Sequence, residues 1–158
     1  MEDVTVNSFE YVHLSEVDPN FTLIDEGFYN LKLISAEYKE YDKTATGGKK
    51  GEFIKLGFAV TGDPKFSGRR VYPSALFPNS FVLKTLRRIQ DASGVEQTGT
   101  IRNWVEKLNG IGPVLKLKVM QVPDANFAGV PNPRTVQADG SPGTKVDIDW
   151  AAGVQPGE

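Results

Sequence analysis

An alternation of side chains between residues 51 and 60 strongly limits how this chain can fold. Every second position holds a large apolar residue: Ile54, Leu56, Phe58 and Val60. The positions between them hold Phe53, Lys55, Gly57 and Ala59. A period of two predicts a β-strand with one face in the core and the other outside. The Gly62-Asp63-Pro64 turn then predicts an antiparallel return strand from residue 69 through Tyr72 toward Phe77.

Three further segments are predicted to be strands, over residues 28–38, 114–122 and 144–150. Their predicted inward residues are Tyr29, Leu31, Leu33, Leu115, Leu117, Val119, Val146, Ile148 and Trp150. Their predicted outward cations are Lys32, Lys116 and Lys118. These segments alternate as the central one does, so we expect them to contribute their apolar faces to the same core.

Two helices are predicted between the third and fourth strands. The first is capped by Asn79 or Ser80 and ends at Gly94, and its buried stripe is Val82, Leu86 and Ile89. The second begins near Thr100 and is predicted to stop at Gly110. Trp104 is predicted to pack the second helix onto the body of the domain.

Two loops carry the remaining cations and aromatic residues of interest. Residues 41–51 hold Lys43, Lys49 and Lys50 among three glycines, and a loop so rich in glycine is expected to be flexible. Residues 123–143 hold seven Pro or Gly residues together with Phe127 and Arg134. A loop this long within a compact domain is functional or disordered. Residues 134–138 are predicted to pair with residues 144–148 across an Asp139-Gly140 turn.

Charge divides the chain into unequal parts. Residues 1–26 contain seven acidic residues and no Lys or Arg, so the remaining residues carry +5 although the whole chain carries −2. This asymmetry predicts an acidic N-terminal arm beside a mildly basic body. The predicted organisation is therefore an acidic arm at 1–26, one domain at 27–150 and a flexible tail at 151–158.

The composition argues against several other classes of protein. The chain has no Cys, no apolar run near 18 residues and no basic, apolar leader, which predicts a cytoplasmic protein without a membrane helix. His13 is the only histidine, and no nucleophile motif is present. Asp147 and Asp149 share a strand face, which suits a carboxylate site or, more commonly, solubilising edge charges. We expect no enzymatic activity, metal or cofactor.

The order of these elements predicts the fold class. Three strands, a helix, a short helix, a strand, a long loop and a final strand are the order of an OB-fold, a five-stranded Greek-key barrel. The chain is thus predicted to be mainly β, with one or two short helices between strands three and four. OB-folds bind nucleic acid on strands two and three, between the loops that join strands one and two and strands four and five.

The sequence also resembles a family of small phage-encoded proteins regarded as single-stranded-DNA-binding-like. The resemblance covers roughly residues 21–122 and rests on four motifs: FTLIDEGFYNL at residues 21–31, FIKLGFAV at 53–60, FSGRRVY at 66–72 and NG through LKLKV at 109–119. It implies an OB-type fold and a phage origin. Residues 1–20 and the long loop fall outside it.

The leading functional hypothesis is sequence-independent binding of single-stranded DNA in phage replication or recombination. Base stacking is assigned to Phe53 and Tyr72, with Phe127 as a weaker candidate, since bases stack on exposed rings. The residues predicted to contact phosphate are Lys43, Lys49, Lys50, Lys55, Arg69, Arg70, Lys116, Lys118 and Arg134. The alternative is an OB-like interaction module that recruits recombination or nuclease proteins, with the acidic arm docking a basic partner. A choice between DNA and RNA, and the oligomeric state, stay open.

Overall fold

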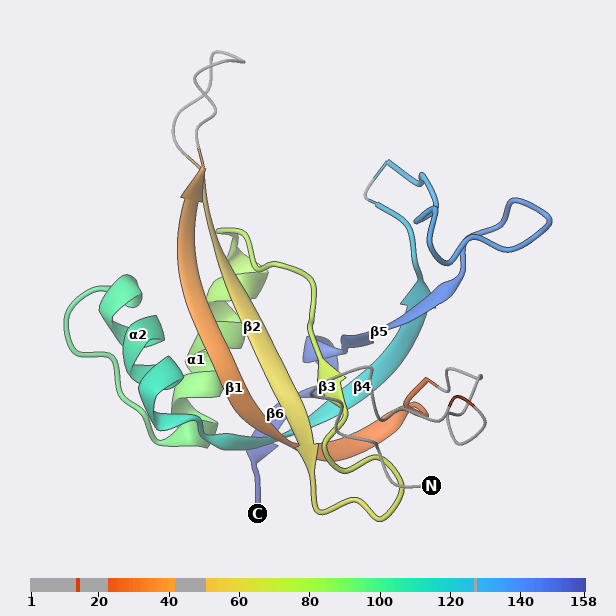
Figure 1. Ribbon diagram of the computed structural model, residues 1–158. Coiled ribbons are helices and arrows are strands. Elements are labelled where there is room, and N and C mark those ends of the chain that lie inside the picture. Colours follow the sequence, from red (N-terminus) through yellow and green to blue (C-terminus); the bar gives the residue numbers. More distant parts are fainter. Residues whose placement is uncertain (1–13, 15–22, 42–50, 127) are drawn as a thin grey trace.

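The computed structural model describes residues 14, 23–41, 51–126 and 128–158. Its elements are β1 (Gly27–Tyr41), β2 (Gly51–Thr61), β3 (Arg70–Val71), α1 (Ser80–Ser93), α2 (Ile101–Ile111), β4 (Val114–Pro123), β5 (Thr144–Ile148), a 3-10 turn η3 (Trp150–Ala152) and β6 (Val154–Pro156). All strand pairs are antiparallel, in the order β3-β2-β1-β4-β5, and β6 pairs with β4 (Figure 1). The mainly β class with two helices is confirmed. The described residues form six strands rather than the expected five.

β1 is the strand around which the sheet bends. Its first half pairs with β4, from Gly27 opposite Val119 to Lys32 opposite Val114, and its second half continues alongside β2 as far as Tyr41. A bulge between Leu33 and Ser35 marks the point where β4 leaves. Bulges bend a strand and increase its twist, so the sheet curves around its inner side.

α2 covers the part of β1 that β4 leaves without a strand partner. The Ala36 N–H donates to Asn109 Oδ1 at 2.9 Å, and the Leu33 N–H donates to the Pro113 carbonyl at 2.9 Å. These bonds satisfy backbone donors that would otherwise lie unpaired against the helix. Figure 1 shows both helices on one side of the β1–β2 ribbon.

One hydrophobic core lies between the curved sheet and the helices. Ile54, Leu56, Phe58 and Val60 are all at most 6% exposed, which confirms the predicted inward face of β2. The inward faces of β1 and β4 and the α1 stripe are confirmed in the same way: Leu31, Leu33, Leu115, Leu117, Val119, Val82, Leu86 and Ile89 are buried. Burial of alternate residues on three neighbouring strands sets their register firmly, because a one-residue slip would expose every one of them.

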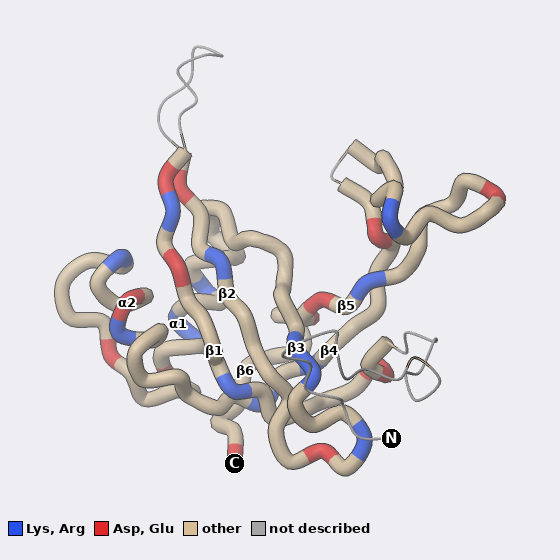
Figure 2. The backbone as a smooth tube through the Cα atoms, viewed as in Figure 1, with Lys and Arg blue, Asp and Glu red and all other residues tan. Residues whose placement is uncertain are grey.

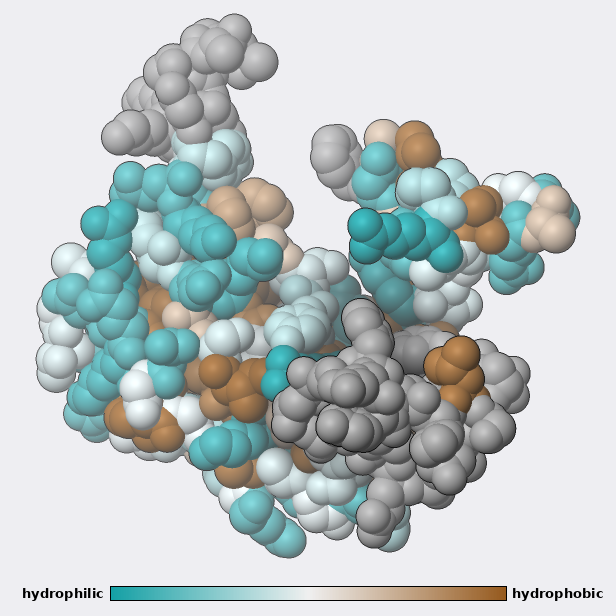
Figure 3. Space-filling view, viewed as in Figure 1, coloured by the Kyte–Doolittle hydropathy of each residue, from teal (hydrophilic) through white to brown (hydrophobic). Residues whose placement is uncertain are grey.

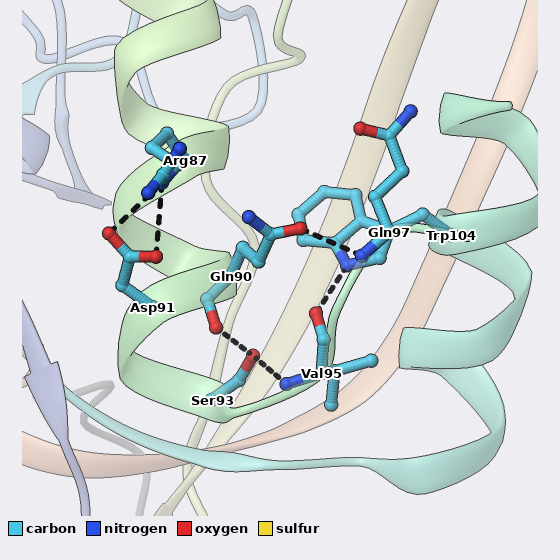
Figure 4. A network of polar contacts seen from close by, with 7 residues as sticks. All are labelled: Arg87, Gln90, Asp91, Ser93, Val95, Gln97 and Trp104. Atoms are coloured by element: carbon cyan, nitrogen blue, oxygen red, sulfur yellow. Dashed lines mark hydrogen bonds and ion pairs between the residues drawn. The ribbon is translucent and has the colours of Figure 1, made fainter. Parts of the chain in front are cut away.

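The α1–α2 connection is held by a local network of hydrogen bonds (Figure 4). The buried Trp104 donates its indole N–H to the Val95 carbonyl at 2.7 Å, and the Gln97 N–H donates to Gln90 Oε1 at 2.7 Å. Trp104 is 3% exposed, so the predicted packing role of this residue is confirmed. Satisfying an indole N–H in the core is the usual requirement for burying Trp.

Both helix starts are confirmed, and one helix end is corrected. Asn79 Oδ1 accepts from the Val82 N–H at 2.8 Å, and Thr100 Oγ1 accepts from the Asn103 N–H at 3.1 Å. The predicted stop at Gly110 is wrong, because α2 continues through it to Ile111. Gly112 ends the helix instead, with φ of 62° and its N–H donating to the Leu108 carbonyl. A left-handed residue is what this cap requires, and glycine adopts it without strain.

The third strand is shorter than predicted. β3 is confined to Arg70–Val71, and pairing with β2 resumes only at the isolated bridge between Ile54 and Leu76. Pro73, which has no N–H to donate, interrupts the ladder. Beyond it the Ser74 N–H and hydroxyl turn toward β5 and donate to the Asp147 carboxylate at 3.2 and 2.7 Å.

The predicted pairing of residues 134–138 with residues 144–148 is also wrong. β5 pairs with β4 instead, from Thr144 opposite Pro123 to Ile148 opposite Val119. A turn does form at Asp139-Gly140, where the Gln137 N–H donates to the Ser141 carbonyl, but no ladder extends from it. The segment between β4 and β5 therefore projects from the sheet (Figure 1).

The C-terminal residues differ from the flexible tail predicted for 151–158. After the η3 turn, β6 pairs with β4 from Leu117 opposite Val154 to Leu115 opposite Pro156. β5 occupies the same edge of β4 only from Val119 onward, so the first half of that edge is open to a second strand. Trp150, buried against Phe58 with ring centroids 6.3 Å apart, anchors the turn between the two strands.

Candidate nucleic-acid interface

The outer sheet face is the surface of β1–β4 that points away from the core. Its cations come from four strands: Lys32, Lys39, Lys55, Arg70, Lys116 and Lys118. The register brings several of them together, because Ala59 lies opposite both Lys32 and Arg70, and Lys116 lies opposite Asn30, two residues from Lys32. Figure 2 shows Lys and Arg positions spread along β2, β3 and the lower sheet. Such a spread of cations follows a phosphate backbone rather than a single anion.

Carboxylates are sparse on this face. Among the described residues of β1 and β2, Glu37 is the acidic residue that points outward, and it pairs with Lys39 at 3.4 Å. Glu37 also lies directly across from Lys55. An exposed ion pair of this kind is weak and easily rearranged, so it does not prevent Lys55 from meeting a phosphate.

The Tyr72 ring lies beside Gly57 of β2. The ideal Cβ position of Gly57 is only 2.9 Å from Tyr72 Cε1 and 2.5 Å from Ser35 Oγ, so any side chain at residue 57 would displace this ring. Gly57 itself is buried, while Tyr72 is 58% exposed. The absence of a side chain at residue 57 thus lets the tyrosine ring approach the β2 backbone closely, while more than half of its surface stays exposed. An exposed ring beside Lys55 and Arg70 is suited to stacking a base.

Phe53 belongs to a second aromatic group at the far end of the β1–β2 ribbon. Its ring centroid is 5.9 Å from that of Tyr41 and 5.7 Å from that of Phe77. Phe53 is half-buried, whereas Phe77 is 47% exposed. Phe53 is therefore partly covered by its neighbours, and Phe77 offers the larger free ring surface of the two.

The structure brings together only some of the predicted contact residues. Lys55, Arg70, Tyr72, Lys116 and Lys118 share the outer sheet face, with Phe53 at its end. Arg69 lies just before β3, half-buried, and Arg134 lies on the segment between β4 and β5. Lys43, Lys49, Lys50 and Phe127 fall outside the described residues.

Several aromatic residues of this surface are not among the contact residues predicted from the sequence. Phe28, 50% exposed, lies opposite Lys118 and adds a third ring to the outer sheet face. Its outward position could have been predicted, because Phe28 precedes Asn30 and Lys32 at the same period of two along β1. Tyr41 and Phe77 carried no such signal, because their meeting depends on the Ile54–Leu76 bridge beyond a proline.

Two projecting segments flank this face. We define the arm as residues 124–126 and 128–143, between β4 and β5. Figure 1 shows the described end of the β1–β2 ribbon and the arm rising on either side of β3. In the space-filling view the surface is hollowed between them (Figure 3). This hollow is an open channel rather than an enclosed pocket, which suits an extended ligand.

The acidic N-terminal segment joins the body beside the β2–β3 turn. Ile24 is buried, and its carbonyl accepts from Gln121 Nε2 at 3.0 Å. Asp25 pairs with Lys65 at 3.6 Å, and its carbonyl accepts from the Tyr29 hydroxyl at 2.7 Å. Burial and the nearby Asp63 and Asp25 raise the pKa of Tyr29 above its usual value. The last residues of the acidic segment are therefore part of the domain. Residues 1–13 and 15–22 lie outside the described part of the chain.

Of the two carboxylates considered for a metal or acid–base site, Asp147 has a structural role. Asp147 accepts from the Ser74 N–H, the Ser74 hydroxyl and its neighbour, the Ile148 N–H at 2.7 Å. It therefore ties the segment after β3 to β5. The described residues contain no group of three metal-ligating side chains. Of the helices in that part of the chain, neither α1 nor α2 has the length and apolar character needed to cross a membrane.

Comparison with family models, curated proteins and solved structures finds no match to this chain. Function therefore has to be argued from the residues and geometry of the outer sheet face.

Proposed function

We propose that the protein binds single-stranded DNA, independently of sequence, on the outer sheet face. The observation that carries this proposal is the Tyr72 ring, which lies against Gly57, is 58% exposed and is adjacent to Lys55 and Arg70. Stacking on such a ring tolerates any base, because every base has a π-face. Lys32, Lys116 and Lys118 continue the cationic surface toward β4 and meet the phosphates there.

The proposed fold is an OB-type Greek-key barrel. The hydrogen-bonded ladder is open between β3 and β5, but the bonds from Ser74 to Asp147 bridge this gap. A path β1-β2-β3-β5-β4 back to β1 is the strand order of an OB barrel, and both helices fall between its third and fourth strands. Under this proposal, β2 and β3 and the two flanking segments occupy the positions where OB-folds bind oligonucleotides.

The biological setting is proposed from the resemblance to phage single-stranded-DNA-binding-like proteins. Coating of single strands during phage replication or recombination, in the host cytoplasm, is the role that this resemblance implies. Stoichiometric binding, without catalysis, a metal or a cofactor, is the mode of action that an open cationic face with exposed rings supports best.

A second candidate function is recruitment of recombination or nuclease proteins through an OB-like module. It is favoured by an apolar groove of about 330 Å³ between the β1–β2 ribbon and the two helices, which meets the end of the outer sheet face at Phe53. Recruitment through this groove would engage α1 and α2, whereas DNA binding on the outer sheet face would engage β3 and β4, so one experiment distinguishes them.

That experiment is a titration of the isotope-labelled protein with oligo-dT, followed by amide chemical shifts. The proposal predicts that the largest changes map to β2, β3 and residues 114–118 of β4. Amides of α1 and α2 should move little. Changes centred on the helices, or none at saturating oligonucleotide, would contradict DNA binding by the outer sheet face.

A further inference from the structure

The groove between the ribbon and the helices is an apolar site with no assigned occupant. Its floor is formed by buried residues from β2, the segment after β3 and α1: Ile54, Leu76, Val82 and Leu86. At its mouth lies Leu83, 55% exposed on α1. An apolar cavity of about 330 Å³ is large enough for one or two aliphatic side chains from another molecule.

The rim of this groove is acidic. Glu40 and Glu52 both line it, and Arg102 is the cation among them. Arg102 is already engaged, since its guanidinium bonds Glu40 at 2.6 Å and lies over the Tyr38 ring at 4.6 Å. Glu52 accepts a hydrogen bond from the Tyr38 hydroxyl, which raises the pKa of Tyr38. A carboxylate takes several hydrogen bonds at once, so Glu52 can still receive a cation.

The arm has the complementary character. Val130 and Val136 are 58% and 41% exposed, and Arg134 lies between them in the sequence. Figure 3 shows hydrophobic side chains on the projecting arm, well separated from the body. The two exposed valines are complementary to the apolar floor of the groove, and the arginine between them is complementary in charge to the carboxylate at its rim.

The arm is also braced from within. The Asp124 carboxylate accepts from Thr135 Oγ1 at 2.7 Å and from Asn132 Nδ2 at 3.1 Å. Asn126 Oδ1 accepts from the N–H groups of Ala128 and Val130, both at 3.0 Å. This network orders the backbone before any partner is met, which lowers the entropy cost of binding.

We propose that the arm of one molecule docks in the groove of a second copy, so that the protein associates head to tail. The helices that line the groove lie behind and to the left of the β1–β2 ribbon in Figure 1, and the arm projects to its right, so a single molecule presents both surfaces at once. Contact between two different patches does not close on itself unless the rotation forms a ring, and it otherwise builds an open chain. Val136 enters the apolar floor and Arg134 pairs with Glu52 of the neighbouring copy.

Self-association through these surfaces does not depend on DNA binding, so it is tested on the full chain without nucleic acid. In sedimentation equilibrium from micromolar to near-millimolar protein, the weight-average mass of the wild type should rise, as expected for a small, weak interface. Arg134→Glu and Glu52→Lys should each weaken association at least tenfold, because each places like charges in contact. Lys107→Glu reverses an exposed cation farther along α2 and should associate as the wild type does.

The decisive sample is an equimolar mixture of Arg134→Glu and Glu52→Lys. In that mixture every arm finds a groove of opposite charge, so association should return to the wild-type level. The Arg134→Glu/Glu52→Lys double variant should also associate with itself. A wild type that stays monomeric, single variants that associate normally, or a mixture that stays monomeric would each overturn the proposal. Loss of association in Glu52→Lys alone would mean that another segment occupies the groove, which also overturns it.

Discussion

Removing the Tyr72 ring should weaken binding to single-stranded DNA without unfolding the protein. One base stacked on an aromatic side chain contributes about 1–3 kcal/mol, so Tyr72→Ala should raise the Kd for oligo-dT by about 5- to 150-fold. Tyr72→Phe keeps the ring and should bind within about twofold of the wild type if stacking dominates. Fluorescence polarisation with a labelled oligo-dT at constant salt measures both.

The same substitution also affects stability, by an amount that the structure bounds. Tyr72 is 58% exposed, so less than half of its surface is covered by the protein. An aromatic side chain has about 200 Å² to bury, which gives about 80 Å² and at most about 2 kcal/mol lost. Phe81→Ala is the matched control, since Phe81 is 49% exposed and lies on α1. It should show a similar loss of stability and unchanged DNA binding.

Gly57→Ala tests the seat of the ring rather than the ring itself. A Cβ at residue 57 would stand 2.9 Å from Tyr72 Cε1, so the ring must move away from the sheet. The backbone of β2 gains from losing a strand glycine, so the fold should persist. We expect binding between that of the wild type and Tyr72→Ala. The stacking argument is refuted if Tyr72→Ala binds as tightly as the Phe81→Ala control.

The remaining predictions concern charge, the acidic segment and the core. Arg70→Ala should make the salt dependence of DNA binding shallower by about 0.7 in the log–log slope, as measured by polarisation at several salt concentrations. Arg87→Ala is the control and should leave the slope unchanged, because Arg87 lies on α1 and is paired with Asp91. Deleting residues 1–20 should tighten DNA binding at low salt and less so at high salt, because it removes five of the seven acidic residues that compete with phosphate. Equal affinity of the deletion variant and the wild type at low salt would contradict this. Trp104→Ala should lower the free energy of unfolding by about 3–5 kcal/mol in urea melts, since it removes a buried ring and leaves the Val95 carbonyl without its donor. A loss of stability smaller than that of Phe81→Ala would refute the packing role of Trp104.

Alternation made the inner faces of β1, β2 and β4 predictable. Each has apolar residues at every second position, and only one register buries them all. The helix starts were equally readable, because Asn79 and Thr100 supply the side-chain oxygen that the first turn needs. In both cases the information lies within a few consecutive residues.

Features that depend on distant partners were not predictable in this way. β5 pairs with β4 because β4 offers an open edge there, and nothing within residues 134–148 indicates that preference over a local hairpin. β6 forms for the same reason, although residues 151–158 look like a fraying end. The position of the Tyr72 ring beside Gly57 depends on both the β2–β3 register and the absence of a side chain at residue 57, so it could not be predicted from the residues around Tyr72 alone. The cations of the candidate site were readable as outward residues, but their grouping with Lys32 and Phe28 followed from the pairing of β1 with β4.

The central claim is tested most directly by the affinity of the protein for labelled oligo-dT, duplex DNA and oligo-U across a range of salt concentrations. If about four phosphates are contacted, log K for oligo-dT should fall with log salt at a slope near −3, about −0.7 for each contact. Duplex DNA should bind more weakly, because its bases are not available to stack on Tyr72. Comparable binding of oligo-U would extend the claim to single-stranded RNA. No binding of oligo-dT at low salt, or an affinity that does not change with salt, would contradict the account.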